Sequence, residues 1–110
     1  MIIATRTLRL HSNNRDVEIP IRVFAPERAK VDWSCRFEIE WPDQKLERFA
    51  IGIDAVQALL LALQMIGAIV YTSKFHEEGK LQWMESGCGY GFPVTNGIRD
   101  MLTGDDKKFF

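Results

Sequence analysis

The chain has few cysteines, no excess of charge and no apolar run long enough to span a membrane, and each shortage excludes a class of protein. Cys35 and Cys88 are its only cysteines, too few for the disulfide framework of a small secreted domain. Its 14 basic and 15 acidic side chains leave a net charge of −1, so no global field would gather nucleic acid or an anionic membrane. The longest apolar stretch, 54–71, contains two glutamines and is shorter than the ~20 residues that a transmembrane helix needs.

The scarcity of cysteine and the first residues of the chain predict where the protein is located. A secretory leader has a basic segment followed by an apolar one, and the first residues of the chain lack this pattern. We therefore expect a cytoplasmic protein with reduced thiols, although a disulfide between the two cysteines stays open.

The composition is that of an ordinary globular protein. Of the 110 residues, 46% are hydrophobic and 26% are charged, and a chain of this length can bury about two-thirds of its surface without disulfides or a metal. We expect one domain over residues 1–110. Its strands are predicted within 2–53, its helix at about 54–75, and a loop-rich C-terminal segment over 76–110.

Four segments before residue 54 alternate apolar and polar side chains with the period of a strand. They cover residues 2–11, 17–25, 33–41 and 46–53. In the last of these, Phe49, Ile51 and Ile53 are expected to face the core. Because short turns join antiparallel neighbours, we predict an α+β fold in which a four-stranded antiparallel meander packs against one long helix. A short fifth strand is possible over 80–84.

From residue 54 onward the period becomes that of a helix. Asp54 and Gln57 fit a capping box, in which each side chain satisfies a free backbone N–H of the first turn. The helix is expected to run from there to about Lys74 or Phe75, with Gly79 beyond it as a stop. Eight apolar residues are predicted to face the sheet: Ala55, Val56, Leu59, Leu60, Ala62, Leu63, Ile66 and Val70.

The opposite side of this helix is also half apolar. It forms a stripe of six residues: Gln57, Leu61, Gln64, Ala68, Tyr71 and Phe75. Because exposed apolar patches on soluble monomers are limited in size, we expect something to cover the stripe. A second copy of the chain in a homodimer is the favoured cover. Residues 81–103 of the same chain and a different partner protein are the alternatives.

Side chains suited to metal or nucleophilic chemistry are scattered along the chain: His11, Cys35, His76 and Cys88. Their spacing fits no metal site, so neither a metal nor a cofactor is predicted, and no catalytic residue is assigned. Cys88 could act as a nucleophile only with a base beside it. The glycines of loop 87–93 lack the strand and helix context of a phosphate-binding loop, and they are expected to let the loop turn tightly. Aromatic residues of the third strand share a face with apolar neighbours, which does not favour nucleic-acid binding.

A pocket is the second functional hypothesis. Asp54 and Gln57 at the start of the helix, with Tyr90 and Phe92 in the glycine-rich loop, would line it and would bind or transform a small molecule. A convergent polar cleft would favour this hypothesis. A large apolar contact would instead favour a protein-interaction module.

Four segments carry a likeness to a known family: Phe24–Pro26, Asp32–Ile39, Gly52–Leu59 and Gly89–Pro93. In these segments the chain resembles an uncharacterised family of small bacterial proteins, known as a domain of unknown function. The resemblance implies a bacterial source and a stand-alone cytoplasmic domain, and it implies no activity, cofactor or catalytic residue. From the residues themselves we predict a non-enzymatic protein-interaction module that self-associates as a homodimer, with no membrane or nucleic-acid partner.

Overall fold

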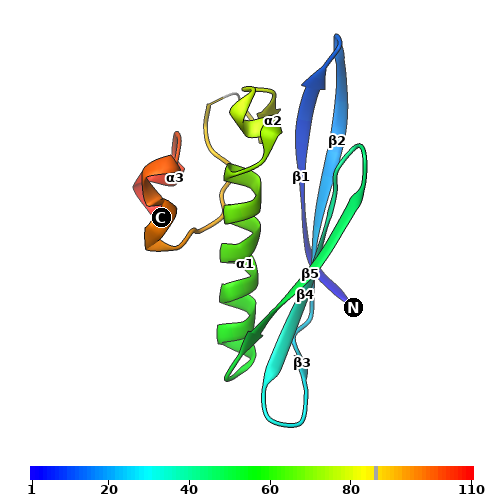
Figure 1. Cartoon of the computed structure of the whole chain (residues 1–110), viewed down its shortest axis with the longest axis vertical. Coiled ribbons are helices and arrows are strands. Elements are labelled where there is room, and N and C mark those ends of the chain that lie inside the picture. Colours follow the sequence, from blue (N-terminus) through cyan, green and yellow to red (C-terminus); the bar gives the residue numbers. More distant parts are fainter. Residues whose placement is uncertain (86) are drawn as a thin grey trace.

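The computed structural model describes residues 1–85 and 87–110, so residue 86, inside the predicted C-terminal segment, lies outside the described residues. Helix α1 (Ala55–Tyr71) lies between an antiparallel sheet and the C-terminal segment, as Figure 1 shows. The C-terminal segment carries the short helices η1 (Asn96–Met101) and α3 (Asp106–Phe109). The prediction of an α+β fold with one main helix is confirmed.

Among the described residues, six strands make up the sheet: β1 (Ile2–Ser12), β2 (Arg15–Phe24), β3 (Glu27–Arg28), β4 (Trp33–Glu40), β5 (Lys45–Gly52) and β6 (Leu81–Gln82). The four long strands pair antiparallel in chain order, β1 with β2, β2 with β4 and β4 with β5. The two-residue strands β3 and β6 pair with β4 and β1. The predicted meander is thus close but incomplete, because β3 was not foreseen.

Strand β4 shows why the alternating segments form strands. Cys35, Phe37 and Ile39 are fully buried against α1 and its neighbouring strands. Their polar neighbours in the sequence, such as Arg36 and Glu40, lie on the outer face. Alternation with period 2 places every second side chain in the core, so the sequence pattern alone determines the faces of this strand.

Strand β5 has the opposite phase from the one predicted. Ala50 is buried, whereas Phe49 and Ile51 are exposed on the outer face and Ile53 follows them into solvent. The cause is the close approach of α1, since a Cβ on Gly52 would collide with the backbone nitrogen of Ala58. Only small residues fit between this end of β5 and the helix, so the large ones turn outward.

Helix α1 begins at the predicted Asp54 cap, except that the Gln57 side chain reaches back to Ile53, one residue before the N-cap. The Asp54 carboxylate accepts from the backbone N–H of Gln57 (2.8 Å), and the Gln57 side chain accepts from the N–H of Ile53 (2.7 Å). The helix ends at Tyr71, earlier than expected, because Ser73 caps a separate helix, α2 (Lys74–Glu77). Gly79 follows α2 with a φ of 71°.

The apolar side chains of α1 are only partly placed as predicted. Ala62, Ile66 and Val70 are buried, whereas Val56 and Leu60 are exposed and the prediction is wrong for them. The helix crosses the sheet so that Ala58, rather than Val56, faces β5. Near its other end the chain itself covers the helix, where the backbone of Pro93 lies directly against Gly67.

Candidate functional site

Five large apolar side chains are exposed where the end of β5 meets the start of α1. We call this surface the β5–α1 patch: Phe49, Ile51, Ile53, Val56 and Leu60. Their exposed fractions run from 47% for Ile51 and Leu60 to 83% for Ile53. Phe49 and Ile51 lie on the outer face of an edge strand, whereas Val56 and Leu60 lie in the first turns of the helix that packs on the inner face, so the patch is close in the chain but spans both sides of the sheet edge.

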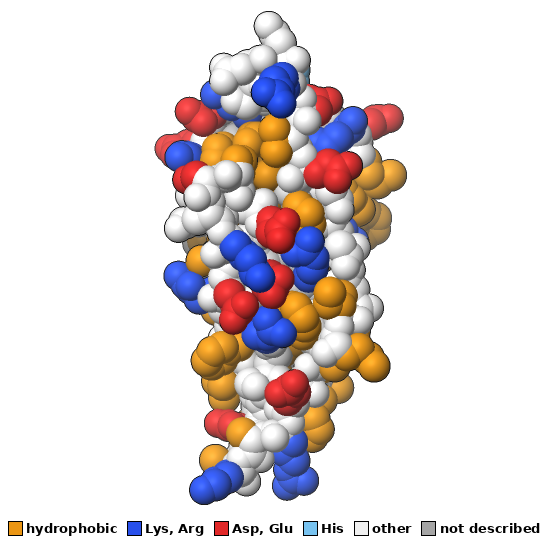
Figure 2. Space-filling model, turned by 90° about the vertical axis from the view of Figure 1, so that its right-hand side faces the viewer, with side chains coloured by type: hydrophobic (Ala, Val, Ile, Leu, Met, Phe, Trp, Pro, Cys, Tyr) orange, Lys and Arg blue, Asp and Glu red, His pale blue; other side chains and the backbone are white. Residues whose placement is uncertain are grey.

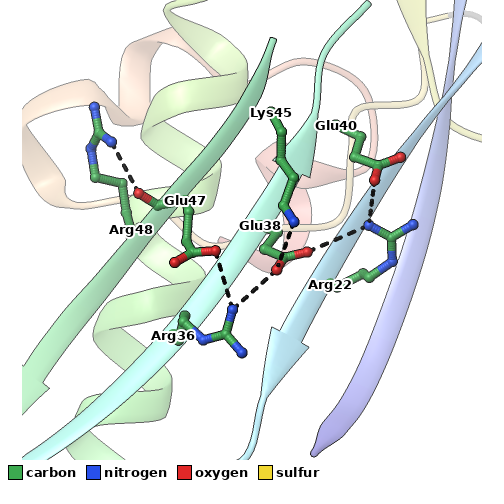
Figure 3. Close-up of polar contacts among 7 residues, drawn as sticks. All are labelled: Arg22, Arg36, Glu38, Glu40, Lys45, Glu47 and Arg48. Carbon is green, nitrogen blue, oxygen red and sulfur yellow. Dashed lines mark hydrogen bonds and ion pairs between the residues drawn. The ribbon is translucent and has the colours of Figure 1, made fainter.

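The outer face of the sheet beside this patch is charged. Glu38 is buried there, and Arg36 (3.0 Å), Lys45 (3.3 Å) and Arg22 (3.6 Å) surround its carboxylate (Figure 3). Figure 2 shows acidic and basic side chains mixed across the middle of this face, with hydrophobic side chains beside and below them. These charges pair with one another, which leaves little net field to attract a charged partner.

The predicted stripe on α1 is not one open surface. Gln57 is exposed, and Leu61, Gln64 and Ala68 are half-buried. The structure corrects the expectation for the last two members of the stripe. Tyr71 is buried inside the chain, and the ring of Phe75 packs against that of Trp41 with 5.2 Å between centroids.

The far end of α1 meets the glycine-rich loop at a buried carboxylate. Oδ2 of Asp106 accepts from the hydroxyl of Tyr71 (2.5 Å) and the N–H of Tyr90 (2.8 Å), and Oδ1 accepts from the N–H of Gly91 (2.9 Å). Gly89 and Gly91 have φ values of 86° and 75°. This alternation turns successive N–H groups toward one point, which is how a loop cradles an anion. Here the anion is the chain's own aspartate.

Three aromatic rings pack beside this carboxylate. Tyr71, His76 and Tyr90 lie edge to face, with centroids 4.9 to 5.4 Å apart. The Tyr90 hydroxyl lies 2.5 Å from Nδ1 of His76. Burial and then the hydrogen bond to Asp106 raise the pKa of Tyr71 to about 12, and burial also raises the pKa of Tyr90. Burial lowers the pKa of His76 below its usual 6.5, so the neutral imidazole is favoured.

Arg6 holds the same loop from the sheet side. Its Nη1 donates to the carbonyl oxygens of Tyr90 (3.2 Å) and Gly91 (2.8 Å), and its guanidinium stacks on the Trp83 ring at 4.0 Å. Burial lowers its pKa, and the charge of Asp106 opposes that shift. Arg6 and Asp106 therefore fasten the loop between β1 and the C-terminal segment.

The four residues predicted to share a pocket do not come together. Asp54 and Gln57 are at the first turn of α1, whereas Tyr90 packs against Tyr71 at the last turn, on the order of 20 Å away at 1.5 Å per residue. The loop does border a cavity of about 500 Å³, which Trp83, Cys88, Gly91, Asp106 and the terminal phenylalanines line. Neither Asp54 nor Gln57 lines it.

The scattered polar residues stay apart in space as well. His11 contacts Asp16 at the β1–β2 turn, and His76 contacts Tyr90. In residues 1–85 and 87–110, no hydrogen bond joins Cys88 to either histidine, and no group of three metal-binding side chains forms. None of the helices in these ranges is long and apolar enough to cross a membrane.

Asp106 is the residue that sequence reasoning missed. It lies in a charged tail that looks solvated, and its partners are 15 to 35 positions earlier in the chain. The alternating glycines of loop 87–93 are the one signal that could have suggested an anion cradle.

Comparison with known proteins places most of the chain in one family. A family model described as a domain of unknown function (DUF6968) matches residues 4–94, from β1 through the glycine-rich loop. The matched region contains the whole β5–α1 patch and stops before Asp106. Comparisons with curated proteins and with solved structures gave no match. On the strength of the family model, the chain belongs to the DUF6968 family, a domain of unknown function.

Proposed function

We propose that this chain is a non-enzymatic protein-interaction module that self-associates through the β5–α1 patch. The observation that carries the proposal is the exposure of five large apolar side chains at the end of β5 and the start of α1. Together they expose on the order of 500 Å² of surface, and the largest patch on a typical soluble monomer is ~300–600 Å² and often functional. A bacterial cytoplasmic setting belongs to the same proposal and rests on the family resemblance and the scarcity of cysteine.

A second copy of the chain is the partner that best suits this patch. The patch contains no charged side chain, and the neighbouring charges on the sheet already pair with one another. A partner selected by charge would therefore find little to recognise here. An apolar surface complements its own copy, and two-fold dimers are the commonest assemblies of soluble chains.

The polar residues of the loop region support a structural role more than a catalytic one. Both oxygens of Asp106 accept hydrogen bonds from within the chain, and the Tyr90 hydroxyl contacts His76 and the carbonyl of Leu81. Groups committed in this way position the loop and offer little to a reacting molecule. The cavity beside the loop keeps ligand binding as a second candidate function, and its apolar lining would suit a hydrophobic molecule.

Light scattering of the purified chain over a range of concentrations tests the proposal. We expect a mass of twice the 12.7 kDa chain at high concentration. Ile53→Lys should restore the mass of a single chain, because a charge buried in an apolar contact is costly. Val17→Lys is the matched control, since Val17 is a partly exposed residue at the other end of the sheet. A wild-type chain that stays at 12.7 kDa would refute the proposal.

A further inference from the structure

Strand β5 offers a backbone edge as well as a patch. It pairs with β4 along its whole length, and among the residues that the structure describes no strand pairs with its other edge. Proteins usually protect such edges with lysines, prolines or bulges, because a bare edge can pair with another strand. The first half of β5 carries Lys45, Glu47 and Arg48, but residues 49–53 have neither charge nor proline. The second half of the edge is therefore unprotected.

Two-fold symmetry limits how two such edges can meet. When identical edge strands pair antiparallel about an axis perpendicular to the sheet, each face of the sheet continues into the second copy. One residue of the strand, which we call the centre of the pairing, must then lie opposite its own copy. A residue that precedes the centre by a given number of positions faces the residue that follows the centre by the same number in the other copy. Each possible centre makes a different set of facing residues.

A centre at Ile51 gives the most favourable set. On the outer face, Phe49 lies opposite Ile53 of the second copy, an aromatic residue against a β-branched one, which is among the stabilising cross-strand pairs. On the inner face, the small residues Ala50 and Gly52 face each other. One step further out, past the end of the strand, Arg48 comes opposite Asp54, whose carboxylate also caps α1, so opposite charges face each other. A centre further along the chain would set β5 against the first residue of α1.

The other centres place charges badly. Centred on Phe49, the pairing sets Lys45 and Glu47 against isoleucines. Centred on Arg48, it sets two guanidinium groups face to face, and centred on Ala50 it still sets Glu47 against an isoleucine. Like charges directly opposite one another are destabilising in a sheet, and a charge against an apolar residue loses water without gaining a partner.

The size of the β5–α1 patch also suits a dimer. A standard interface buries ~800 Å² on each partner, of which a little more than half is apolar. Phe49, Ile51 and Ile53, the members of the patch at the end of β5, supply a large part of that apolar share. Val56 and Leu60 lie on α1, which packs on the inner face of the sheet, and do not belong to the paired outer face.

From this geometry we propose that two copies join through antiparallel pairing of their β5 edges, centred on Ile51, so that one sheet continues through the dimer. The inference rests on the proposed self-association and adds the contact that makes it. Main-chain hydrogen bonds along the edge supply part of the affinity, and the facing side chains fix the register.

Disulfide trapping tests the register directly. In a Cys88→Ser chain the remaining Cys35 is buried and burial raises its pKa, so an introduced thiol is the reactive one. With Ile51→Cys, the two facing Cα atoms would be ~4.5–5.5 Å apart, within the range that a disulfide spans. We expect mild oxidation to convert most of this variant to a covalent dimer on a non-reducing gel.

Phe49→Cys in the same background is the matched control. In the proposed register its two copies lie four residues apart along the strands, at least ~13 Å, so it should stay monomeric on the gel. An equal mixture of Phe49→Cys and Ile53→Cys chains should instead form a mixed dimer, because these positions face each other.

Each outcome separates the register from the self-association. Trapping at residue 51 with none at 49 supports the pairing. Trapping of Phe49→Cys with itself would overturn the Ile51 centre. If the wild-type chain is a dimer by light scattering and none of these variants is trapped, the strand pairing is wrong while the proposed function stands. A wild-type chain that stays monomeric refutes both.

Discussion

Removing the Asp106 carboxylate should destabilise the fold strongly. Asp106→Ala would leave three donors without an acceptor: the buried Tyr71 hydroxyl, the buried N–H of Tyr90 and the part-buried N–H of Gly91. A hydrogen bond to a charged group contributes about 1.5–3 kcal/mol, and an unsatisfied buried donor costs about 1–3 kcal/mol. Since such terms do not add fully, we expect a loss of about 4 kcal/mol.

Urea unfolding, followed by tryptophan fluorescence, measures this loss. Wild type and variants are compared at equal protein concentration, because dimerisation would add to apparent stability. Asp105→Ala is the control. Its carboxylate is mostly exposed and, among the residues that the structure describes, pairs with Lys108 alone, at 3.7 Å, so a change within ~0.5 kcal/mol is expected. If Asp106→Ala unfolds within 1 kcal/mol (about one hydrogen bond) of wild type, with an unchanged slope, the reasoning about this carboxylate fails.

Three further predictions follow from the same end of the molecule. Gly67→Ala should lower the free energy of unfolding by ~1–3 kcal/mol, because the added methyl group overpacks against Pro93. A Cβ at Gly97 meets nothing within 4 Å, so the control Gly97→Ala should change the free energy of unfolding by less than ~1 kcal/mol. Equal urea midpoints for the two variants would contradict the contact between Gly67 and Pro93. Because burial lowers the pKa of His76, the stability that its neutral form contributes is complete above the unfolded value of about 6.5 and is lost as the pH falls through the folded pKa. His76→Gln should flatten that slope of unfolding free energy against pH while His11→Gln keeps it. The two tyrosines of the chain are both buried, so an ultraviolet titration should show almost no tyrosinate at pH ~10–11 in the folded chain and clear ionisation in urea. The free energy of unfolding should fall as the pH rises from the unfolded tyrosine pKa of about 10 toward the folded pKa of about 12 for Tyr71. A normal titration of the folded chain would show that these hydroxyls are not held as described.

The local patterns of the sequence predicted the elements that local interactions determine. The cap needs only Asp54, Gln57 and the backbone from Ile53 to Gln57, so these neighbouring residues fix the start of α1 wherever the helix lies. Strand β4 alternates large apolar and polar residues without ambiguity, and its faces follow from that alternation.

The phase of β5 depends on a neighbour that the strand's own residues do not reveal. Its sequence offers Phe49 and Ile51 on one face and the smaller Ala50 and Gly52 on the other. Hydrophobicity favours burying the larger pair, but the close crossing of α1 leaves room only for the smaller one. The phase of β5 therefore follows from how the strand packs against α1. Because this phase is reversed, Phe49 and Ile51 are exposed and contribute to the β5–α1 patch.

The stripe on α1 was predicted from the helix alone, without the segments that pack on it. Its member Tyr71 is covered by Tyr90 and Asp106 from distant parts of the chain. No short-range pattern links those residues. Contacts across such separations follow from the path of the C-terminal segment, which has few regular elements and therefore little periodicity to interpret.

Asp106 also sets an order in which the protein can be completed. During synthesis the sheet, α1 and the glycine-rich loop leave the ribosome before this residue does, at about 5–20 residues per second. Until it arrives, the amides of Tyr90 and Gly91 and the hydroxyl of Tyr71 have no anion to bind. In a polypeptide that stops short of that aspartate, Arg6 would remain as the side chain that holds the loop, and we expect the loop to be cut more readily by quality-control proteases.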